Sequence, residues 1–276
     1  MTLFFSALIA VFGAALGSFL SVITHRMNTK KKGILFGRSE CPHCHKKLKW
    51  QHLIPIISYL TLQGECAYCK KRISKHYLLL EFFTATILVL IFLNWNFVVG
   101  TTSLIDPTLI TYSIDWLIFE KFLFFAVEAV FLIAIFFYDL KYLEIPDRFS
   151  IPAIIVGLLG VLMFGEPTFA SMLYALLIIV IFFGGQIILS KGRWLGGGDL
   201  RLGALMAVLL GSEKLILALV LSYLIGALVS IPLLIAGKAD GKTALPFGPF
   251  LIAGLLIALF AGTNIIDAYL GYILIP

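Results

Sequence analysis

The sequence has few charged residues: Asp, Glu, Lys and Arg together make up 13% of its 276 residues. Soluble domains carry about 25% charged residues and about 45–50% apolar ones. This chain is instead 61% hydrophobic, with a mean hydropathy of +1.03. So little charge excludes a soluble globular enzyme of ordinary composition, and the sequence predicts a protein that is embedded in a membrane.

Long apolar stretches recur along the chain. A membrane-spanning helix needs about 20 apolar residues. The candidates lie near residues 2–24, 77–96, 117–138, 150–164, 168–190, 200–211, 214–236 and 247–272. The stretch 200–211 is short and contains glycine, so a partial helix is expected there. The sequence thus predicts an all-α, polytopic membrane protein with about eight transmembrane helices.

The first apolar stretch lacks both a basic segment before it and a small-residue cleavage site after it, so a retained helix is expected rather than a signal peptide. Twelve of the 21 Lys and Arg residues lie between Arg26 and Lys75. Cytoplasmic loops carry such an excess. We therefore expect the N-terminus outside and residues 25–76 inside. Alternation then places the loops 139–149, 190–199 and 237–246 in the cytoplasm, and the loop 97–116 outside.

The basic character of residues 25–76 has two readings. The first is a topology signal that also attracts anionic lipid, so that the lipid bilayer is an expected partner. The second is nucleic-acid binding, which would need interleaved aromatic residues or a known module. Neither is present, so no nucleic acid is expected as a partner.

All four cysteines lie in the first basic loop, as CPHC at 41–44 and CAYC at 66–69. A reducing cytoplasm disfavours disulfides, and two CxxC pairs at this spacing are typical of a zinc site. Four thiolates complete a closed tetrahedral shell, which indicates a structural rather than a catalytic metal. A redox CxxC pair is the alternative, but no thioredoxin-like context surrounds either motif. The ligands expected for zinc are Cys41, Cys44, Cys66 and Cys69, with His43 and His45 left at the surface.

Three carboxylates stand out among the 15 of the chain. Asp139 ends the third apolar stretch and Asp199 precedes the sixth, on the same side of the membrane by the alternation above. Two such carboxylates can share a water molecule, one as base and the other as acid, which is the chemistry of aspartic peptidases. Glu128 lies in the middle of a stretch and is either a buried hydrogen-bonded residue or part of a cavity.

Three glycines, 196 to 198, precede Asp199. We expect Gly196 and Gly198 to support the site by letting the backbone enter the membrane edge in unusual dihedral angles and by leaving room for a substrate strand. The alternative is structural, with Asp199 serving as a helix N-cap after a flexible turn. Asp147 is expected in the first turn of the following helix, where its charge favours the helix dipole.

An ordered set of motifs covers nearly the whole chain and resembles the bacterial type IV prepilin peptidases. Its members are GSFLSVITHR at 17–26, CPHC with IPIISYL and GECAYC in the loop, YLLLE at 77–81, DLKYLEIPD at 139–147, GGGDLRLGALMAVLLG at 196–211 and LPFGPFLIAG at 245–254. The chain departs from the family at a few positions, including His45, where glycine is usual. None of the departures affects Asp139, Asp199 or the cysteines.

The resemblance implies that Asp139 and Asp199 are the catalytic pair of a peptidase in the bacterial inner membrane. The implied substrates are prepilins or pseudopilins of type IV pilus or type II secretion systems, cleaved after a glycine at the cytoplasmic face, behind a short basic leader. It also implies N-methylation of the new terminus, with S-adenosylmethionine as the methyl donor. Glu81 would then position the substrate amine, or else pair with a nearby Lys or Arg. The expected regions are a first transmembrane helix at 1–24, the four-Cys zinc loop at 25–76 and a membrane-embedded aspartic peptidase core at 77–276.

Two other functions remain open from the residues themselves. Carboxylates in glycine-broken membrane helices also occur in proton-coupled transporters, which would use Asp139 or Asp199 without cleaving a peptide. A non-enzymatic assembly protein would dock a cytoplasmic partner through the zinc loop and would tolerate changes at both aspartates.

Overall fold

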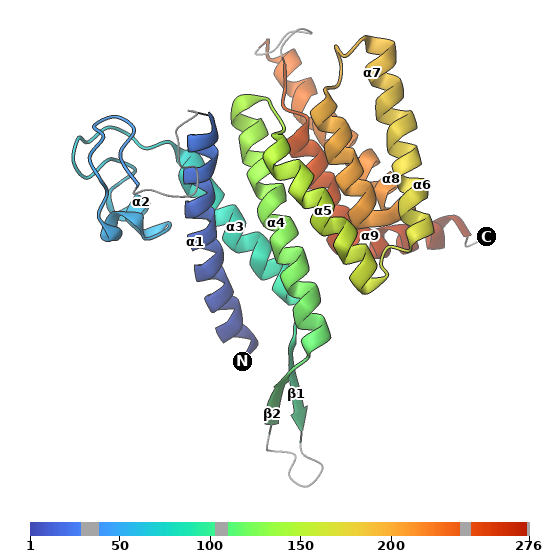
Figure 1. Ribbon diagram of the computed structural model, residues 1–276, viewed down its shortest axis with the longest axis horizontal. Coiled ribbons are helices and arrows are strands. Elements are labelled where there is room, and N and C mark those ends of the chain that lie inside the picture. Colours follow the sequence, from blue (N-terminus) through green and yellow to red (C-terminus); the bar gives the residue numbers. More distant parts are fainter. Residues whose placement is uncertain (29–38, 103–109, 238–243, 275–276) are drawn as a thin grey trace. The chain divides into compact units, whose positions relative to one another are not determined.

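The computed structural model describes residues 1–28, 39–102, 110–237 and 244–274. The predicted loops 25–76, 97–116 and 237–246 therefore lie partly outside the described residues. In the described part, seven helices are long and apolar enough to cross a membrane, and the strands form one two-stranded sheet (Figure 1). The prediction of an all-α, multi-pass membrane protein is confirmed. The chain divides into two compact units, Met1–Ala134 and Ile135–Pro276.

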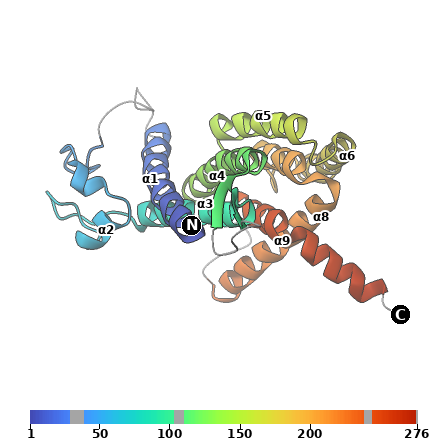
Figure 2. The same ribbon diagram turned by 90° about the horizontal axis from the view of Figure 1, so that it is seen from below.

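The first unit is built on the close packing of α1 (Thr2–Asn28) against α3 (Lys75–Asn94), which run side by side in both views (Figure 1, Figure 2). A Cβ atom at Gly13 would lie 2.8 Å from Cα of Ala85, and one at Gly17 would lie 2.7 Å from Cα of Glu81. Glycines four residues apart let two membrane helices approach this closely. The contact at Gly17 therefore places the backbone of α1 directly against Glu81.

The segment between α1 and α3 contains the short helices η1 (Trp50–Leu53) and α2 (Ile57–Thr61). After α3, the strands β1 (Val98–Thr102) and β2 (Ile110–Ile114) form an antiparallel hairpin that leads into α4 (Trp116–Tyr142). The ring of Phe97 lies 5.2, 5.0 and 5.3 Å from those of Phe92, Phe119 and Phe122. These apolar ring contacts join α3, the hairpin and α4 at one end of the unit.

The second unit begins with the last residues of α4 and continues with α5 (Asp147–Phe164). The predicted stretch 168–190 is one 22-residue span, made of α6 (Phe169–Ile179), a π-helical turn η2 (Val180–Gly184) and α7 (Gly185–Ser190). Two further helices follow, α8 (Gly197–Ile235) and α9 (Gly248–Leu274).

Helix α8 is 39 residues long and is bent at Gly211, which has φ 67° and ψ −177°. The bend is packed against the start of α6, where the N–H of Ser212 donates to Oγ of Ser171 at 2.9 Å. The two apolar stretches predicted at 200–211 and 214–236 are the two arms of this helix. That is why seven spans are found by length where eight apolar stretches were expected.

The second arm of α8 runs antiparallel to α9. Glycines mark the contacts, because Gly262 approaches Lys214, Gly254 approaches Ala218, and Gly226 approaches Phe250. The first arm packs against α6, with Val208 on Met172 and Gly203 on Phe183. The chain therefore leaves one end of the unit at Gly197, reverses at Gly211 and returns to the same end before α9 begins.

Candidate active site and metal centre

Asp139 is held by the start of α9. It lies in the last turn of α4 with only 5% of its surface exposed, and its Oδ2 accepts a hydrogen bond from the N–H of Gly248 at 2.9 Å. The carbonyl of Asp139 accepts from the N–H of Leu143, which ends the helix at φ 56°. A left-handed conformation is uncommon for a residue other than glycine, so α4 is sharply terminated just beyond the carboxylate.

Asp199 is fixed by the start of its own helix. It is the third residue of α8 and half-buried, and its Oδ2 accepts from the N–H of Gly196 at 2.9 Å. The N-cap residue is Gly196 and Asp199 is the third residue of the helix. The predicted alternative, in which Asp199 is the N-cap, is therefore wrong. A carboxylate in the first turn nonetheless satisfies one unpaired N–H and favours the helix dipole. The same side chain can therefore stabilise the helix start and face the site.

The predicted role of the glycines in unusual dihedral angles is wrong. Gly196 has an ordinary extended backbone at φ −93° and ψ 167°, and positive φ values occur at neither Gly197 nor Gly198. What is needed at Gly198 is space, because a Cβ atom there would lie 2.9 Å from Cβ of Ile145. Gly197 has open space around it.

Ile145 is the side chain that joins the three segments. It follows α4, packs against Gly198 at the start of α8, and lies 3.4 Å from the position a Cβ of Gly248 would take. The structure thus brings Asp139 and Asp199 to one end of the second unit, on either side of Ile145. Two carboxylates at one end of a unit meet the first condition for sharing a water molecule.

An ion pair that no pattern in the sequence predicts links the starts of two helices. Arg201, the fifth residue of α8, pairs with Asp147, the first residue of α5. Asp147 lies in the first turn as predicted. Taken alone, each residue is a charged side chain near the start of a helix. Because 53 residues separate them, no periodic pattern in the sequence indicates that they are in contact.

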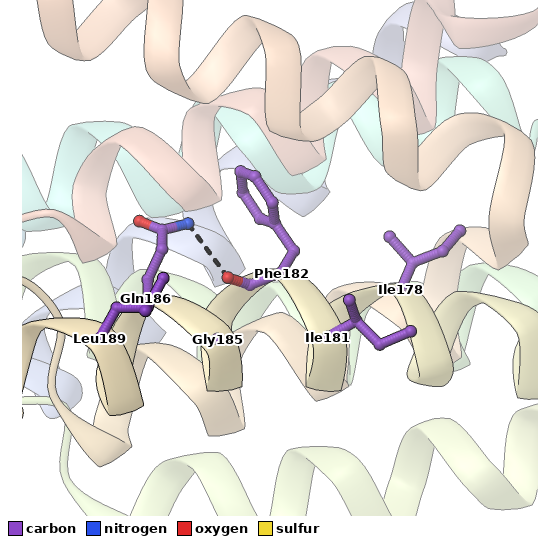
Figure 3. A pocket seen from close by; sticks show the side chains of 6 residues that line it. All are labelled: Ile178, Ile181, Phe182, Gly185, Gln186 and Leu189. Carbon is purple, nitrogen blue, oxygen red and sulfur yellow. Dashed lines mark hydrogen bonds between the residues drawn. The ribbon is translucent and has the colours of Figure 1, made fainter.

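A groove with a volume of about 440 Å³ runs along α6, η2 and α7 (Figure 3). Its wall is apolar apart from the amide of Gln186, which donates from Nε2 to the carbonyl of Phe182 at 3.2 Å (Figure 3). The hydroxyl of Tyr223 on α8 donates to Oε1 of Gln186, also at 3.2 Å. The lining residues are Ile178, Ile181, Phe182, Gly185, Gln186 and Leu189.

Aromatic contacts connect this groove to the aspartates. The ring of Tyr223 lies 5.7 Å from that of Phe182 and 5.1 Å from that of Phe247. Phe247 immediately precedes Gly248, whose N–H holds Asp139. Sequence reasoning missed Gln186, Tyr223 and Phe247, because an aromatic or amide residue in an apolar stretch looks like ordinary packing.

The four cysteines of the first unit form one cluster. Their Sγ atoms all lie within 4.8 Å of one another, and those of Cys41 and Cys69 are 3.9 Å apart. Tetrahedral zinc with Zn–S bonds of about 2.3 Å requires sulfur atoms about 3.8 Å apart. The cluster therefore fits a four-thiolate metal centre, while His43 and His45 are exposed, as predicted.

The two CxxC motifs adopt the same turn. In each, the N–H of the first cysteine donates to a carbonyl five residues later, at 3.1 and 2.9 Å. Its carbonyl accepts from the N–H four residues later, at 2.9 and 3.0 Å. That fourth residue is left-handed in both turns, His45 at φ 55° and Lys70 at φ 57°. A glycine at position 45 would adopt this conformation without the strain that a Cβ atom causes.

The pKa values of two thiols in the cluster are shifted in opposite directions. At Cys66 burial would raise the pKa, but hydrogen bonds from the backbone of Cys69 and Tyr68 and contacts with neighbouring thiols lower it to about 7. At Cys69 a hydrogen bond from the backbone of Lys71 would lower the pKa, but burial and the three other thiols raise it to about 11. The cluster thus readily forms a first thiolate, which is the form that binds metal.

Glu81 accepts a hydrogen bond from the segment that carries the four cysteines. Its Oε2 accepts from the backbone of Ile56 at 2.7 Å, and Ser18 of α1 also bonds to its carboxylate. Ile56 has φ 62° and ψ −53°, and the N–H of Ile57 donates to the carbonyl of Pro55. This is a γ-turn of the rare, strained kind, and a β-branched residue at positive φ is an outlier. Such strain is a feature of binding and catalytic sites.

Glu128 is 1% exposed within α4, and neither of its carboxylate oxygens has a hydrogen-bond partner in the described part of the chain. The predicted alternative of a hydrogen-bonded residue is therefore not what the described residues show.

Two family descriptions match the chain. "Bacterial Peptidase A24 N-terminal domain" matches residues 11–95, and "Type IV leader peptidase family" matches residues 126–231. Among curated proteins, three named "Prepilin leader peptidase/N-methyltransferase" are each 29% identical to it. The protein from Aeromonas hydrophila is matched over 97% of this chain and 94% of its own length, that from Legionella pneumophila over 98% and 96%, and that from Bacillus subtilis over 96% and 97%. No solved structure matches the chain.

Proposed function

The chain belongs to the type IV leader peptidase family, and on that premise we propose that it is an aspartic endopeptidase whose catalytic residues are Asp139 and Asp199. The observation that carries the proposal is the convergence of these two carboxylates at one end of the second unit, around Ile145. They come from different helices and are brought together only by the fold.

The reaction needs one ionised and one protonated carboxyl group. The ionised carboxylate takes a proton from a bound water as the water oxygen attacks the scissile carbonyl carbon. The protonated carboxyl donates a hydrogen bond, and then its proton, to the carbonyl oxygen. When the C–N bond breaks, the leaving nitrogen receives a proton from the pair. The N–H of Gly248 orients Asp139, and the first turn of α8 orients Asp199. Each carboxylate is therefore held in one orientation before a substrate binds.

We infer that the substrates are prepilins or pseudopilins, cleaved after a glycine between a basic leader and an apolar helix. The apolar groove along α6 and α7 offers a surface for that helix, because it connects through Tyr223 and Phe247 to the turn that holds Asp139. The positively charged loop supports a cytoplasmic position for the site and an outer position for the N-terminus, in the inner membrane.

A second activity, N-methylation of the new terminus, is proposed for the first unit. Glu81 is buried, negatively charged when ionised, and held by the γ-turn at Ile56, so it can bind and orient a substrate amine. S-adenosylmethionine supplies the methyl group when bound. The four cysteines are proposed to hold zinc, which would fold the two CxxC turns and thereby place the γ-turn over Glu81.

The experiment that tests the function is a mass-spectrometric assay with the purified chain in detergent. The substrate is a peptide with a basic leader, a Gly–Phe junction and an apolar tail, incubated with S-adenosylmethionine. A product that begins at Phe is expected, with a second product one methyl group heavier. An intact peptide in the presence of zinc-loaded, folded protein would remove the peptidase proposal and favour a transporter.

A further inference from the structure

Four large apolar side chains are exposed together in the zinc loop. Trp50 and Leu53 on η1 are 72% and 38% exposed, and Ile57 and Leu60 on α2 are 59% and 62% exposed. We name these four residues the interfacial patch. Unlike the exposed side chains of the spans, they belong to helices of four and five residues that cannot cross a membrane.

The depth of this patch along the membrane helices follows from one hydrogen bond. The N–H of Ile56, which lies between η1 and α2, donates to Glu81 at 2.7 Å. Glu81 is six residues beyond Lys75, where α3 begins, which is about 9 Å along the helix. Segments that lie in the membrane interface are buried by about 5–10 Å. The γ-turn therefore holds the patch alongside the first turns of a membrane helix rather than above them.

The charges around the patch have one predominant sign. Within residues 39–75 there are seven Lys and Arg residues and two Glu residues. All seven basic residues are exposed: Lys46, Lys47, Lys49, Lys70, Lys71, Arg72 and Lys75. A basic surface next to exposed Trp, Leu and Ile side chains is the composition of a segment that lies on anionic lipid. Trp in particular is enriched at the membrane interface.

We propose that the interfacial patch inserts into the anionic lipid surface of the membrane that the spans cross, with the basic residues on the lipid headgroups. The proposed substrate leader is a poorer occupant, because a basic leader is repelled by the same charges. Lipid contact at the interfacial patch would help to hold the γ-turn at Ile56 against Glu81. The metal cluster would restrain the same segment through the CxxC motifs on either side of it. The inference concerns lipid contact alone and does not depend on the peptidase activity.

The test uses the full chain in lipid nanodiscs and the fluorescence of Trp50. Brominated lipids quench tryptophan in the membrane, and acrylamide quenches tryptophan in water, so comparing the parent chain with Trp50→Phe isolates the Trp50 signal. We expect the Trp50 signal to be quenched by brominated lipid and protected from acrylamide. We also expect lipid quenching of Trp50 to be about twofold stronger in phosphatidylglycerol discs than in phosphatidylcholine discs.

Charge variants test the electrostatic part. Lys46→Gln with Lys47→Gln should remove the difference between the two lipids, whereas Lys191→Gln with Arg193→Gln, which alters two exposed charges of the second unit, should leave it unchanged. Zinc content equal to that of the parent shows that the loop is still folded. Quenching of Trp50 by acrylamide in both lipids would overturn the proposal. So would protection that arises only when a precursor peptide is added, since that outcome would assign the patch to the substrate.

Discussion

The backbone N–H of Gly248 donates a hydrogen bond to Oδ2 of Asp139 at 2.9 Å, across 109 residues of sequence. A backbone donor at the start of a helix cannot rotate away as a side chain can. The carboxylate is therefore held in one orientation by the position of α9.

Asp139→Asn and Asp199→Asn should each abolish cleavage, because an amide can neither take a proton from water nor return one. The measurement is the yield of product beginning at Phe, with membrane insertion checked by detergent extraction. Asp267→Asn, which alters an exposed carboxylate on α9, is the matched control and should cleave normally. Normal cleavage by either active-site variant would refute the catalytic pair.

Gly248→Ala should slow cleavage by about 10²-fold. The added Cβ would lie 2.7 Å from Oδ2 of Asp139, so the carboxylate has to move. Alanine is a good helix former, so α9 should still begin at this residue. Gly271→Ala is the matched control, because nothing lies within 4 Å of a Cβ there. Equal rates for the two variants would show that the contact at Gly248 does not position Asp139.

Glu81→Gln should separate the two proposed activities. Glutamine can still accept the N–H of Ile56, so the loop should stay in place, but it loses the charge that would bind an amine. We expect cleavage close to that of the parent chain and methyl transfer reduced by about 10²-fold, read from the ratio of methylated to unmethylated product. Glu213→Gln, at an exposed position, controls for loss of charge. A parallel fall in both activities would contradict separate sites.

Removing the metal should unfold the loop. Cys41→Ser or Cys66→Ser should lower zinc content and expose residues 39–75 to proteases, with a larger loss of methyl transfer than of cleavage. Thiols must lose protons to bind metal, so zinc should also dissociate as the pH falls. His43→Ala serves as the control and should keep its zinc. Its loss of metal, or equal loss of both activities in the Cys variants, would count against a four-thiolate structural site.

His45→Gly should tighten zinc binding. A residue with a Cβ pays about 1–2 kcal/mol in the left-handed conformation, and His45 has φ 55°. Relief of about 1 kcal/mol corresponds to about fivefold tighter binding in competition with a chelator. Lys70→Gly should behave in the same way. His43→Gly changes a position without positive φ and should leave zinc affinity unchanged. An equal gain in zinc affinity in that variant would show that relief of backbone strain is not the cause.

Local patterns in the sequence were sufficient to predict much of this fold. The apolar stretches became helices, the two CxxC motifs became matching turns around one cluster, and Asp139 and Asp199 were expected at one end because each lies at a helix terminus. Each of these features depends on spacing within about 20 residues, or on counting membrane crossings. Both are properties of the sequence itself.

The remaining features are contacts between distant backbones, which leave no pattern in the residues. Nothing in LPFGPF indicates that the N–H of Gly248 binds Asp139, and nothing in IPIISYL indicates a γ-turn whose N–H reaches Glu81. The glycines before Asp199 predict unusual dihedral angles and room for a substrate strand, whereas Gly198 is needed because Ile145 packs on it. A glycine can be needed for its backbone conformation or because a neighbour leaves no room for a side chain. Which of the two applies depends on a neighbour that the sequence does not identify.

The reversal of α8 at Gly211 means that its first arm does not reach across a bilayer. The arm from Gly197 to Gly211 is about 22 Å long, whereas the hydrocarbon core of a bilayer is about 30 Å thick. When Gly197 lies at one surface of that core, the bend at Gly211 lies inside it. In the proposed reaction Asp199 is carried at the start of this arm, so the length of the arm sets how deep the chain turns back beneath the site.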